Sequence, residues 1–192
     1  MELPVVNHSD YVAKIKDDNK FPIKKFGELA KYLLENKVVK KFYNPKPCSF
    51  NTLKEAHSKN YINQIKNKTL DDILVKKIGF PLEDTIVRRS FIATGGTVLA
   101  AKLAINYGLS CNTAGGSHHA NFHSGSGYCV FNDVAVAAKY LLNRGLARKI
   151  LLLDLDVHQG NGSADIFKDD KNVFTFSMHS KSNYPAKKAK SD

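Results

Sequence analysis

Two aspartates and a histidine alternate along one short stretch, which offers the most specific chemistry in the sequence. Residues 149–162 read KILLLDLDVHQGNG, so Asp154, Asp156 and His158 follow an apolar run at every second position and precede a glycine-rich turn. Residues two apart share a face of a β-strand, so these three side chains should point the same way. Carboxylates and imidazoles suit Zn²⁺ or a similar divalent ion, and a catalytic zinc takes about three protein ligands plus water. The stretch predicts a metal site to which it supplies two ligands.

A simpler alternative is that an acid at the end of this strand only caps the following helix. The run Ile150–Leu153 is continuously apolar, as in a parallel strand buried on both faces, and such sheets bind ligands beyond the carboxyl ends of their strands. Burying two carboxylates there without partners would cost on the order of several kcal/mol each. A cation between them removes that cost, so we favour the metal site.

The adjacent histidines His118 and His119 follow Gly115 and Gly116 and form a second candidate group. From a loop, both imidazoles can face one pocket; the alternative is two loop histidines exposed to solvent. Histidine titrates nearest to neutral pH, so one ring can take a proton from a metal-bound water while the other holds or delivers one. Asp154 is the natural carboxylate to orient one of the two rings.

The elements that must position these residues alternate between strand and helix. Helical spacing and capping signals predict helices over 24–36, from Thr52 through Ile65, over 85–107, 133–143 and 162–167, with a mixed segment at 71–80 and His57 as a surface or half-buried residue. Strands are expected around 3–6, 109–114, 150–153 and 173–179. This order indicates an α/β fold with a parallel sheet. Residues 1–192 contain no repeat and no linker, so we expect one domain.

Composition narrows the class of protein. The chain has 192 residues, 43% of them hydrophobic, and a formal charge of +11. Its lysines are scattered in pairs rather than interleaved with aromatic residues, so we expect a solvated surface and no specific nucleic-acid binding. Cys48, Cys111 and Cys129 form no CxxC pair, which favours a reducing compartment and hence the cytoplasm. No run of about 18 apolar residues predicts a membrane span, and no export signal is recognisable.

Three motifs in this order resemble the histone deacetylase family: GGSHHA at 115–120, GYCVFND at 127–133 and DLDVHQGNG at 154–162. The patterns IGFPLEDTIVRRS and VFTFSMHSKSNYP are similar to the bacterial branch close to class IV deacetylases. The resemblance covers nearly the whole chain. It implies the arginase/deacetylase fold, a three-layer αβα structure with a mainly parallel sheet. It also implies a Zn²⁺ or Fe²⁺ site and hydrolysis of acyl-lysine or a related acylated small amine.

The resemblance further implies roles for the candidate residues. Asp156 and His158 would be metal ligands, and His118 and His119 would manage protons around the attacking water. Asp154 would orient His118.

By the same resemblance, further positions would line the substrate channel or bind a second ion. Asn161 stands where many relatives have an aspartate that partners the second histidine. Gly127 and Tyr128 match one wall of the acyl channel, and Tyr184 is the candidate for the opposing wall. The resemblance also implies a monovalent cation such as K⁺ near a set of residues comprising Asp154, Asp156, His158, Ser177 and Met178.

Members of this family continue past the point that corresponds to Asp192, with a second metal-binding aspartate and a tyrosine that polarises the substrate carbonyl. Neither has a counterpart here, so we expect the amino-terminal part of one incomplete deacetylase domain, inactive by itself, with a separate carboxyl-terminal half as a partner. Its last strand should expose an edge and apolar faces.

Two other functions stay open. One is a non-catalytic remnant or binding module. The other is a binuclear-metal ureohydrolase of the arginase type, which the tandem histidines and the GYCVFND segment at 127–133 disfavour because they suit a single metal and a narrow acyl channel.

Overall fold

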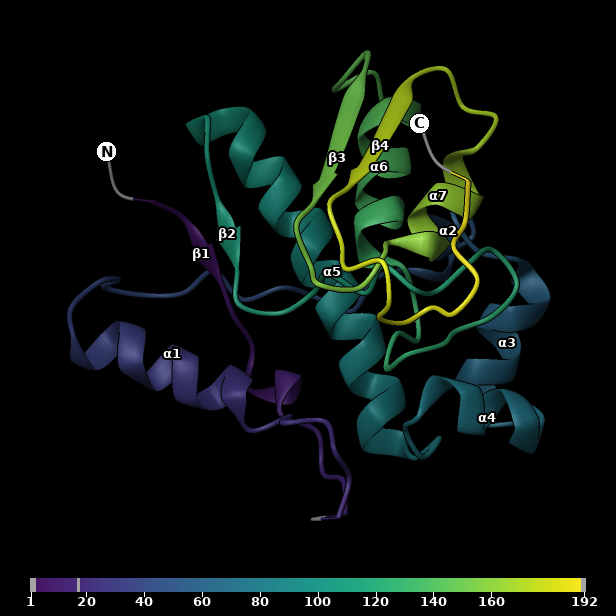
Figure 1. Ribbon diagram of the computed structural model, residues 1–192. Helices are drawn as coiled ribbons and strands as arrows, with labels where there is room; N and C mark the ends of the chain where they lie inside the picture. The colour runs from purple at the N-terminus through teal and green to yellow at the C-terminus, as the bar shows by residue number, and fades with distance from the viewer. Residues whose placement is uncertain (1–2, 17, 191–192) are drawn as a thin grey trace.

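The long helix α5 (Asp84–Tyr107) runs through the centre of the protein (Figure 1). The structure, a computed structural model, describes residues 3–16 and 18–190. Helix α5 packs against α6 (Asp133–Asn143) and against two short strands, β1 (Val5–Val6) and β2 (Cys111–Asn112). Its buried side chains join the main hydrophobic core, so α5 connects the amino-terminal elements to the later ones.

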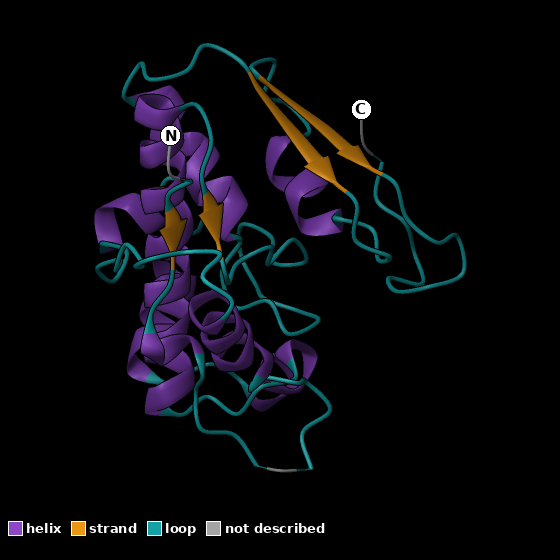
Figure 2. Cartoon of the chain, turned by 90° about the vertical axis from the view of Figure 1, so that its left-hand side faces the viewer, coloured by secondary structure: helices purple, strands orange, loops and turns teal. Residues whose placement is uncertain are grey.

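The strands form two separate parallel pairs (Figure 2). Strand β1 pairs with β2, with Val5 opposite Cys111. Strand β3 (Ile150–Asp154) pairs with β4 (Val173–Ser177), with Asp154 opposite Ser177. The α/β architecture with parallel strands, predicted from the sequence, is confirmed.

The remaining elements are short helices that surround this framework. They are a 3-10 helix Ser9–Tyr11, α1 (Lys25–Glu35), α2 (Phe50–Leu53), α3 (Lys59–Asn67), α4 (Asp72–Ile78) and α7 (Asn161–Phe167). The single helix expected from Thr52 through Ile65 is wrong: α2 and α3 are separate, because the side chains of Ser49 and Ser58 each cap a helix start. No described helix is both long and apolar enough to cross a bilayer.

One face of β3 differs from the sequence expectation. The apolar run predicted a strand buried on both faces, but Leu151 and Leu153 are 60% and 58% exposed. The alternate residues Ile150 and Leu152 pack against the main core. In the described part of the chain, therefore, β3 is covered on one face only.

Two glycines in the middle of α5 allow other segments to approach its backbone closely. A Cβ atom on Gly95 would overlap the carbonyl oxygen of Lys46 and lie 3.0 Å from the backbone nitrogen of Cys48. A Cβ on Gly96 would overlap the hydroxyl of Tyr11. The cost of glycine in a helix is thus offset by direct packing of two segments on α5.

We predict that Gly95→Ala lowers the free energy of unfolding by about 1–3 kcal/mol, because the overlapped atom is backbone and the segment must move. The matched control is Gly27→Ala in α1, whose Cβ would lie 3.1 Å from a methyl group of the Val12 side chain. That neighbour can shift, so the higher helix propensity of alanine should leave the control as stable as the parent. Urea unfolding followed by circular dichroism measures both, and an unchanged midpoint for Gly95→Ala would contradict the packing argument.

His57 also differs from the sequence expectation, since it is fully buried rather than at the surface or half-buried. Its Nδ1 lies 2.9 Å from the carbonyl oxygen of Asn121, and its Nε2 accepts a hydrogen bond from the backbone N–H of Asn132 at 2.9 Å. The ring is therefore neutral, with the proton on Nδ1. Burial lowers the pKa of His57 to about 4. The histidine joins the loop that follows His119 to the start of α6.

His57 should make the fold less stable in acid. The pKa is lower in the folded state than in the unfolded state, so only the unfolded chain gains a proton between pH 6.5 and 4. We predict that this proton removes up to about 3 kcal/mol of unfolding free energy across that window and nothing above pH 7. The measurement is urea unfolding at pH 7.5 and 5.0 for the parent and His57→Gln, with the exposed His123→Gln as control. An equal pH dependence in the parent and His57→Gln would disprove the assignment.

Candidate active site

The histidine pair lies in a loop held against the first turn of α7. His118 and His119 are only 8% and 5% exposed. The backbone N–H groups of Gly162 and Ser163 both donate to the carbonyl oxygen of His118, at 2.9 and 3.1 Å. The alternative of two solvent-exposed loop histidines is wrong for this structure, because both rings are inside.

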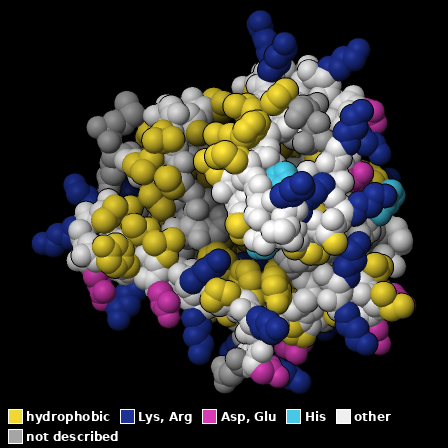
Figure 3. Space-filling view, in the orientation of Figure 1, with side chains coloured by type: hydrophobic (Ala, Val, Ile, Leu, Met, Phe, Trp, Pro, Cys, Tyr) yellow, Lys and Arg dark blue, Asp and Glu magenta, His cyan; other side chains and the backbone are white. Residues whose placement is uncertain are grey.

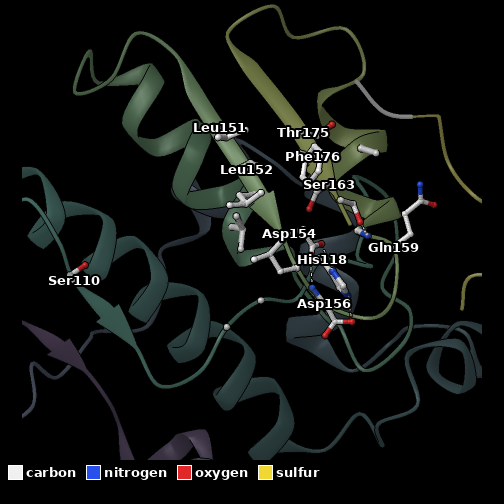
Figure 4. A pocket seen from close by; sticks show the side chains of 18 of the residues that line it. Ser110, His118, Leu151, Leu152, Asp154, Asp156, Gln159, Ser163, Thr175 and Phe176 are labelled. Atoms are coloured by element: carbon white, nitrogen blue, oxygen red, sulfur yellow. Dashed lines mark hydrogen bonds and ion pairs between the residues drawn. The ribbon is translucent and has the colours of Figure 1, made fainter. Parts of the chain in front are cut away.

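His118 pairs with a carboxylate at the end of β3. Its Nδ1 lies 2.5 Å from Oδ2 of Asp154, and its Nε2 lies 3.9 Å from Oδ1 of Asp156 (Figure 4). A Cβ at Gly160 would overlap the same Asp154 oxygen, so the glycine leaves room for the carboxylate. Asp154 therefore fixes the ring orientation and stabilises a proton on Nδ1.

His119 pairs with an amide instead. Its Nδ1 lies 2.7 Å from Oδ1 of Asn161, the first residue of α7. Burial, reinforced by the neighbouring His118, lowers the pKa of His119 to about 4. The ring is thus neutral at pH 7, and with Nδ1 donating to the amide oxygen its Nε2 keeps a lone pair that can accept a proton.

Asp156 and His158 lie just beyond these buried pairs and are much more open to solvent. Their side chains are 52% and 41% exposed, and Oδ1 of Asp156 lies 3.0 Å from Nδ1 of His158. Partial burial opposes ionisation of Asp156, but the backbone N–H of His158 and the ring of His118 outweigh it and lower the pKa of this carboxyl group. Two donor atoms this close can both reach one zinc ion at about 2.0–2.1 Å. Among residues 3–16 and 18–190, no third His, Cys, Asp or Glu completes a metal-binding group.

An aromatic ring and a glycine border the outer side of His119. The Tyr184 ring meets the His119 ring edge to face, at 4.8 Å between centroids and 88° between planes. Gly127 has a φ of +54°, and a Cβ there would lie 2.7 Å from the His119 ring and 3.2 Å from that of Tyr184. A side chain at position 127 would therefore disturb both rings.

Tyr128 has different neighbours. Its ring packs 5.2 Å from the rings of both Phe21 and Phe80, and a Cβ on Gly79 would lie 2.9 Å from it. The structure thus places Gly127 and Tyr184 against His119 and places Tyr128 in an aromatic cluster beside them.

Ser177 and Met178 lie next to Asp154 through strand pairing. The backbone N–H of Met178 donates to the Asp154 carbonyl oxygen at 3.0 Å. The Ser177 hydroxyl accepts from the backbone N–H of Gly160 at 3.2 Å. The candidate residues for the monovalent ion therefore gather at one end of β3 and β4.

Asp133 supports the site, although the sequence analysis gave it no role. It is 1% exposed, and its carboxylate accepts from the backbone N–H groups of Gly116 and Ser117 at 3.1 and 2.7 Å and from the Thr97 hydroxyl at 2.5 Å. This anchors the glycine turn that leads into His118. The available signal was its place at the end of GYCVFND, directly before an alanine-rich helix.

The chain has recognisable relatives among known proteins. The model of the histone deacetylase domain matches residues 20–192. The chain is 45% identical over 194 residues to an uncharacterized protein of Picosynechococcus sp., covering all of this chain and 65% of that protein. It is 29% identical over 181 residues to histone deacetylase 2 of Arabidopsis thaliana, covering 86% of this chain and 45% of that protein.

Solved structures show the same fold. The crystal structure of an HDAC homolog complexed with SAHA superimposes with a TM-score of 0.82 at 24% identity, over 98% of this chain and 54% of that chain. An HDAC homolog from Aquifex aeolicus gives a TM-score of 0.81 at 25% identity, over 96% of this chain and 53% of that chain. The chain thus spans roughly half to two thirds of the length of these proteins. On the domain match and the arginase/deacetylase fold, the chain belongs to the histone deacetylase family.

Proposed function

We propose that this chain provides the proton-transfer residues and two metal ligands of a zinc-dependent hydrolase that removes an acyl group, of acetyl type, from lysine or a related small amine. The observation that carries the proposal is the pair of side-chain contacts His118–Asp154 and His119–Asn161, buried directly behind Asp156. Family membership supports deacetylase chemistry. Because the chain spans only part of its relatives, the activity is assigned to the complete domain.

Asp156 and His158 would hold the metal, Zn²⁺ or Fe²⁺, with at least one further ligand from outside the described residues. Their donor atoms, 3.0 Å apart, fit two positions of such a site. When bound, the ion would polarise the acyl carbonyl and lower the pKa of a coordinated water from about 15.7 towards about 7.

The two histidines would divide the proton transfers. His119 is neutral and has Nε2 free, so we assign it the removal of the proton from the attacking water. His118, whose ring is held by the carboxylate of Asp154, would protonate the leaving amine. Asn161 supplies no negative charge, which keeps His119 a weaker base than a carboxylate partner would.

The other candidate residues receive supporting roles in this proposal. Tyr184 and Gly127, which border His119, would form the walls of the acyl channel, with Tyr128 stabilising the wall from behind. K⁺ would bind near Asp154, Ser177 and Met178, with Asp156 and His158 close by. The three free cysteines are in keeping with a cytoplasmic protein.

We predict that the purified chain binds about one Zn²⁺ or Fe²⁺, more weakly than a complete three-ligand site. Asp156→Ala should abolish this binding in calorimetry. Asp165→Ala, which removes an exposed carboxylate from nearby α7, should leave it unchanged. Equal metal binding by the parent and Asp156→Ala would remove the ligand assignment.

A fluorogenic acetyl-lysine assay tests the proposed function. The chain alone should show no hydrolysis above a His118→Ala, His119→Ala double variant, since an oxyanion donor worth about 10²- to 10³-fold and the further metal ligand are both missing. Co-expression with the unmatched part of the Picosynechococcus protein should give metal-dependent turnover.

In that complex His119→Ala should lower kcat/KM by about 10²- to 10⁴-fold, whereas the exposed loop variant His123→Ala should not. Turnover by the short chain alone would show that no further residue is needed. A soluble complex that hydrolyses neither acetyl-lysine nor acetylated polyamines would favour a non-catalytic binding module.

A further inference from the structure

Tyr184 lies on a surface loop that leaves the candidate site and returns to it. Residues 180–189 form this Tyr184 loop. At its start, the backbone N–H of Ser180 donates to the carbonyl oxygen of Val157 at 2.9 Å. At its end, the backbone of the loop bonds to the side chain of Gln159. The loop is thus attached to the two residues that flank the candidate metal ligand at position 158.

The attachment at the end of the loop is a pair of hydrogen bonds to one side-chain amide. Nε2 of Gln159 donates to the carbonyl oxygen of Ala189 at 3.0 Å, and the backbone N–H of Ala189 donates to Oε1 of Gln159 at 2.7 Å. Gln159 is only 3% exposed, and in Figure 4 its side chain points away from His118 and Asp156. A buried amide that lost these bonds would keep unpaired polar atoms, which is costly. Both polar atoms of Gln159 are therefore used to hold the loop.

Lys188 holds the same loop from inside. Its ammonium group donates to the carbonyl oxygen of Asn183 and, at 2.7 Å, to that of Pro185, so it bonds on both sides of Tyr184 in the chain. The basic side chains in Figure 3 mostly project from the surface into solvent, as is usual for lysine. Lys188 is instead half-buried and turned back onto its own loop. Because an ammonium group carries three donors, this one side chain can fix both backbone groups next to Tyr184.

The loop held in this way places the Tyr184 ring beside two candidate histidines. The centroid of the tyrosine ring lies 4.8 Å from that of His119 and 6.4 Å from that of His158. Tyr184 is 43% exposed, so packing alone fixes its position poorly. The hydrogen bonds made by Gln159 and Lys188 therefore determine where the ring lies.

We propose that Gln159 and Lys188 are positioning residues that set the width of the acyl channel by holding Tyr184 against His119. The inference rests on the proposed function, because the channel wall matters only if the site accepts an acyl-lysine. Loss of either hold lets the loop move outward, since the Tyr184 ring is already partly open to solvent. The channel then accepts a longer acyl group. A residue that only stabilised the fold would instead change the rates for short and long acyl groups equally.

The first test measures the position of Tyr184 in the 192-residue chain and needs no activity. In NMR spectra of Gln159→Leu, the protons of the His119 ring should shift to the positions that they have in Tyr184→Ala, because the neighbouring aromatic ring is displaced in one variant and absent in the other. Hydrogen exchange at the Ala189 amide should become at least about 10-fold faster, since its acceptor is removed.

Matched variants show whether these changes are specific. Lys188→Met should move the His119 signals in the same way as Gln159→Leu, because it removes the donors inside the loop. Lys187→Met, which changes the exposed neighbouring lysine, should leave them unchanged. Gln64→Leu in α3 makes the same substitution at a half-buried glutamine in another part of the fold and should also leave them unchanged.

The second test measures selectivity in the complex with the unmatched part of the Picosynechococcus protein. The ratio of kcat/KM for butyryl-lysine to kcat/KM for acetyl-lysine should rise about 10-fold or more in Gln159→Leu and in Lys188→Met, because the two additional methylene groups no longer meet a fixed wall. Lys187→Met and Gln64→Leu should keep the ratio of the parent.

Circular dichroism checks that each variant folds, and the surface variant Lys188→Met decides the question if Gln159→Leu does not. A complex that hydrolyses neither substrate would contradict the proposed function, whereas the NMR signals of His119 would still report the position of Tyr184. Unchanged His119 signals in folded Gln159→Leu and Lys188→Met would overturn the inference. An unchanged selectivity ratio in an active complex would overturn it as well.

Discussion

The candidate site depends on one close approach of two backbones, that of residues 118–120 and that of the first turn of α7. A Cβ at Gly162 would overlap the carbonyl oxygen of Ala120, so only glycine allows the contact. The N–H groups of Gly162 and Ser163 then bond to the His118 carbonyl. With the two segments held together, Asn161 reaches His119 and Asp154 reaches His118. Residues 36 and 42 positions apart are hydrogen-bonded pairs because the two backbones lie in contact.

A second set of contacts holds the other side of the same loop. The Asn132 side chain donates to the Ala120 carbonyl at 3.0 Å and to the Ser163 hydroxyl at 3.0 Å, and its backbone N–H donates to His57. Asn132 also caps α6 by accepting from Ala135. One buried amide thus joins the loop, α6 and α7, so the position of the histidines depends on helix packing far from the chemistry.

Local patterns were sufficient to predict the elements that carry the site. The alternation of Asp154, Asp156 and His158 after an apolar run predicted both a strand end and a group of polar side chains, and α6 has the predicted bounds. What could not be predicted depends on distant segments. The sequence predicted His57 to be at the surface or half-buried because its two partners, Asn121 and Asn132, lie more than sixty positions away. The assignment of ligand and proton-transfer roles stays a prediction, since geometry alone does not test it.

Leu151 and Leu153 differ from the sequence expectation in the opposite direction to His57, because they are more exposed than predicted. A continuous apolar run is the correct sequence signal for a strand covered on both faces, and in this structure one face has no cover among the described residues. The sequence signal and the structure agree if another segment supplies the missing layer. The disagreement between pattern and burial is thus itself informative, because it marks residues that the pattern assigns to a core and that are exposed in the described part of the chain.

The candidate site likewise has a buried part and an exposed part. The rings of His118 and His119 are buried, and each has a side-chain partner within 2.7 Å, whereas Asp156 and His158 are about half exposed and lie 3.0 Å apart. A buried ring with fixed partners needs little rearrangement to transfer a proton. Water screens the charge of a half-exposed carboxylate, so a cation bound between Asp156 and His158 would be attracted more weakly than in a buried site. The two histidine rings are therefore held in a buried, hydrogen-bonded environment, whereas Asp156 and His158 lie at the open side of the same site.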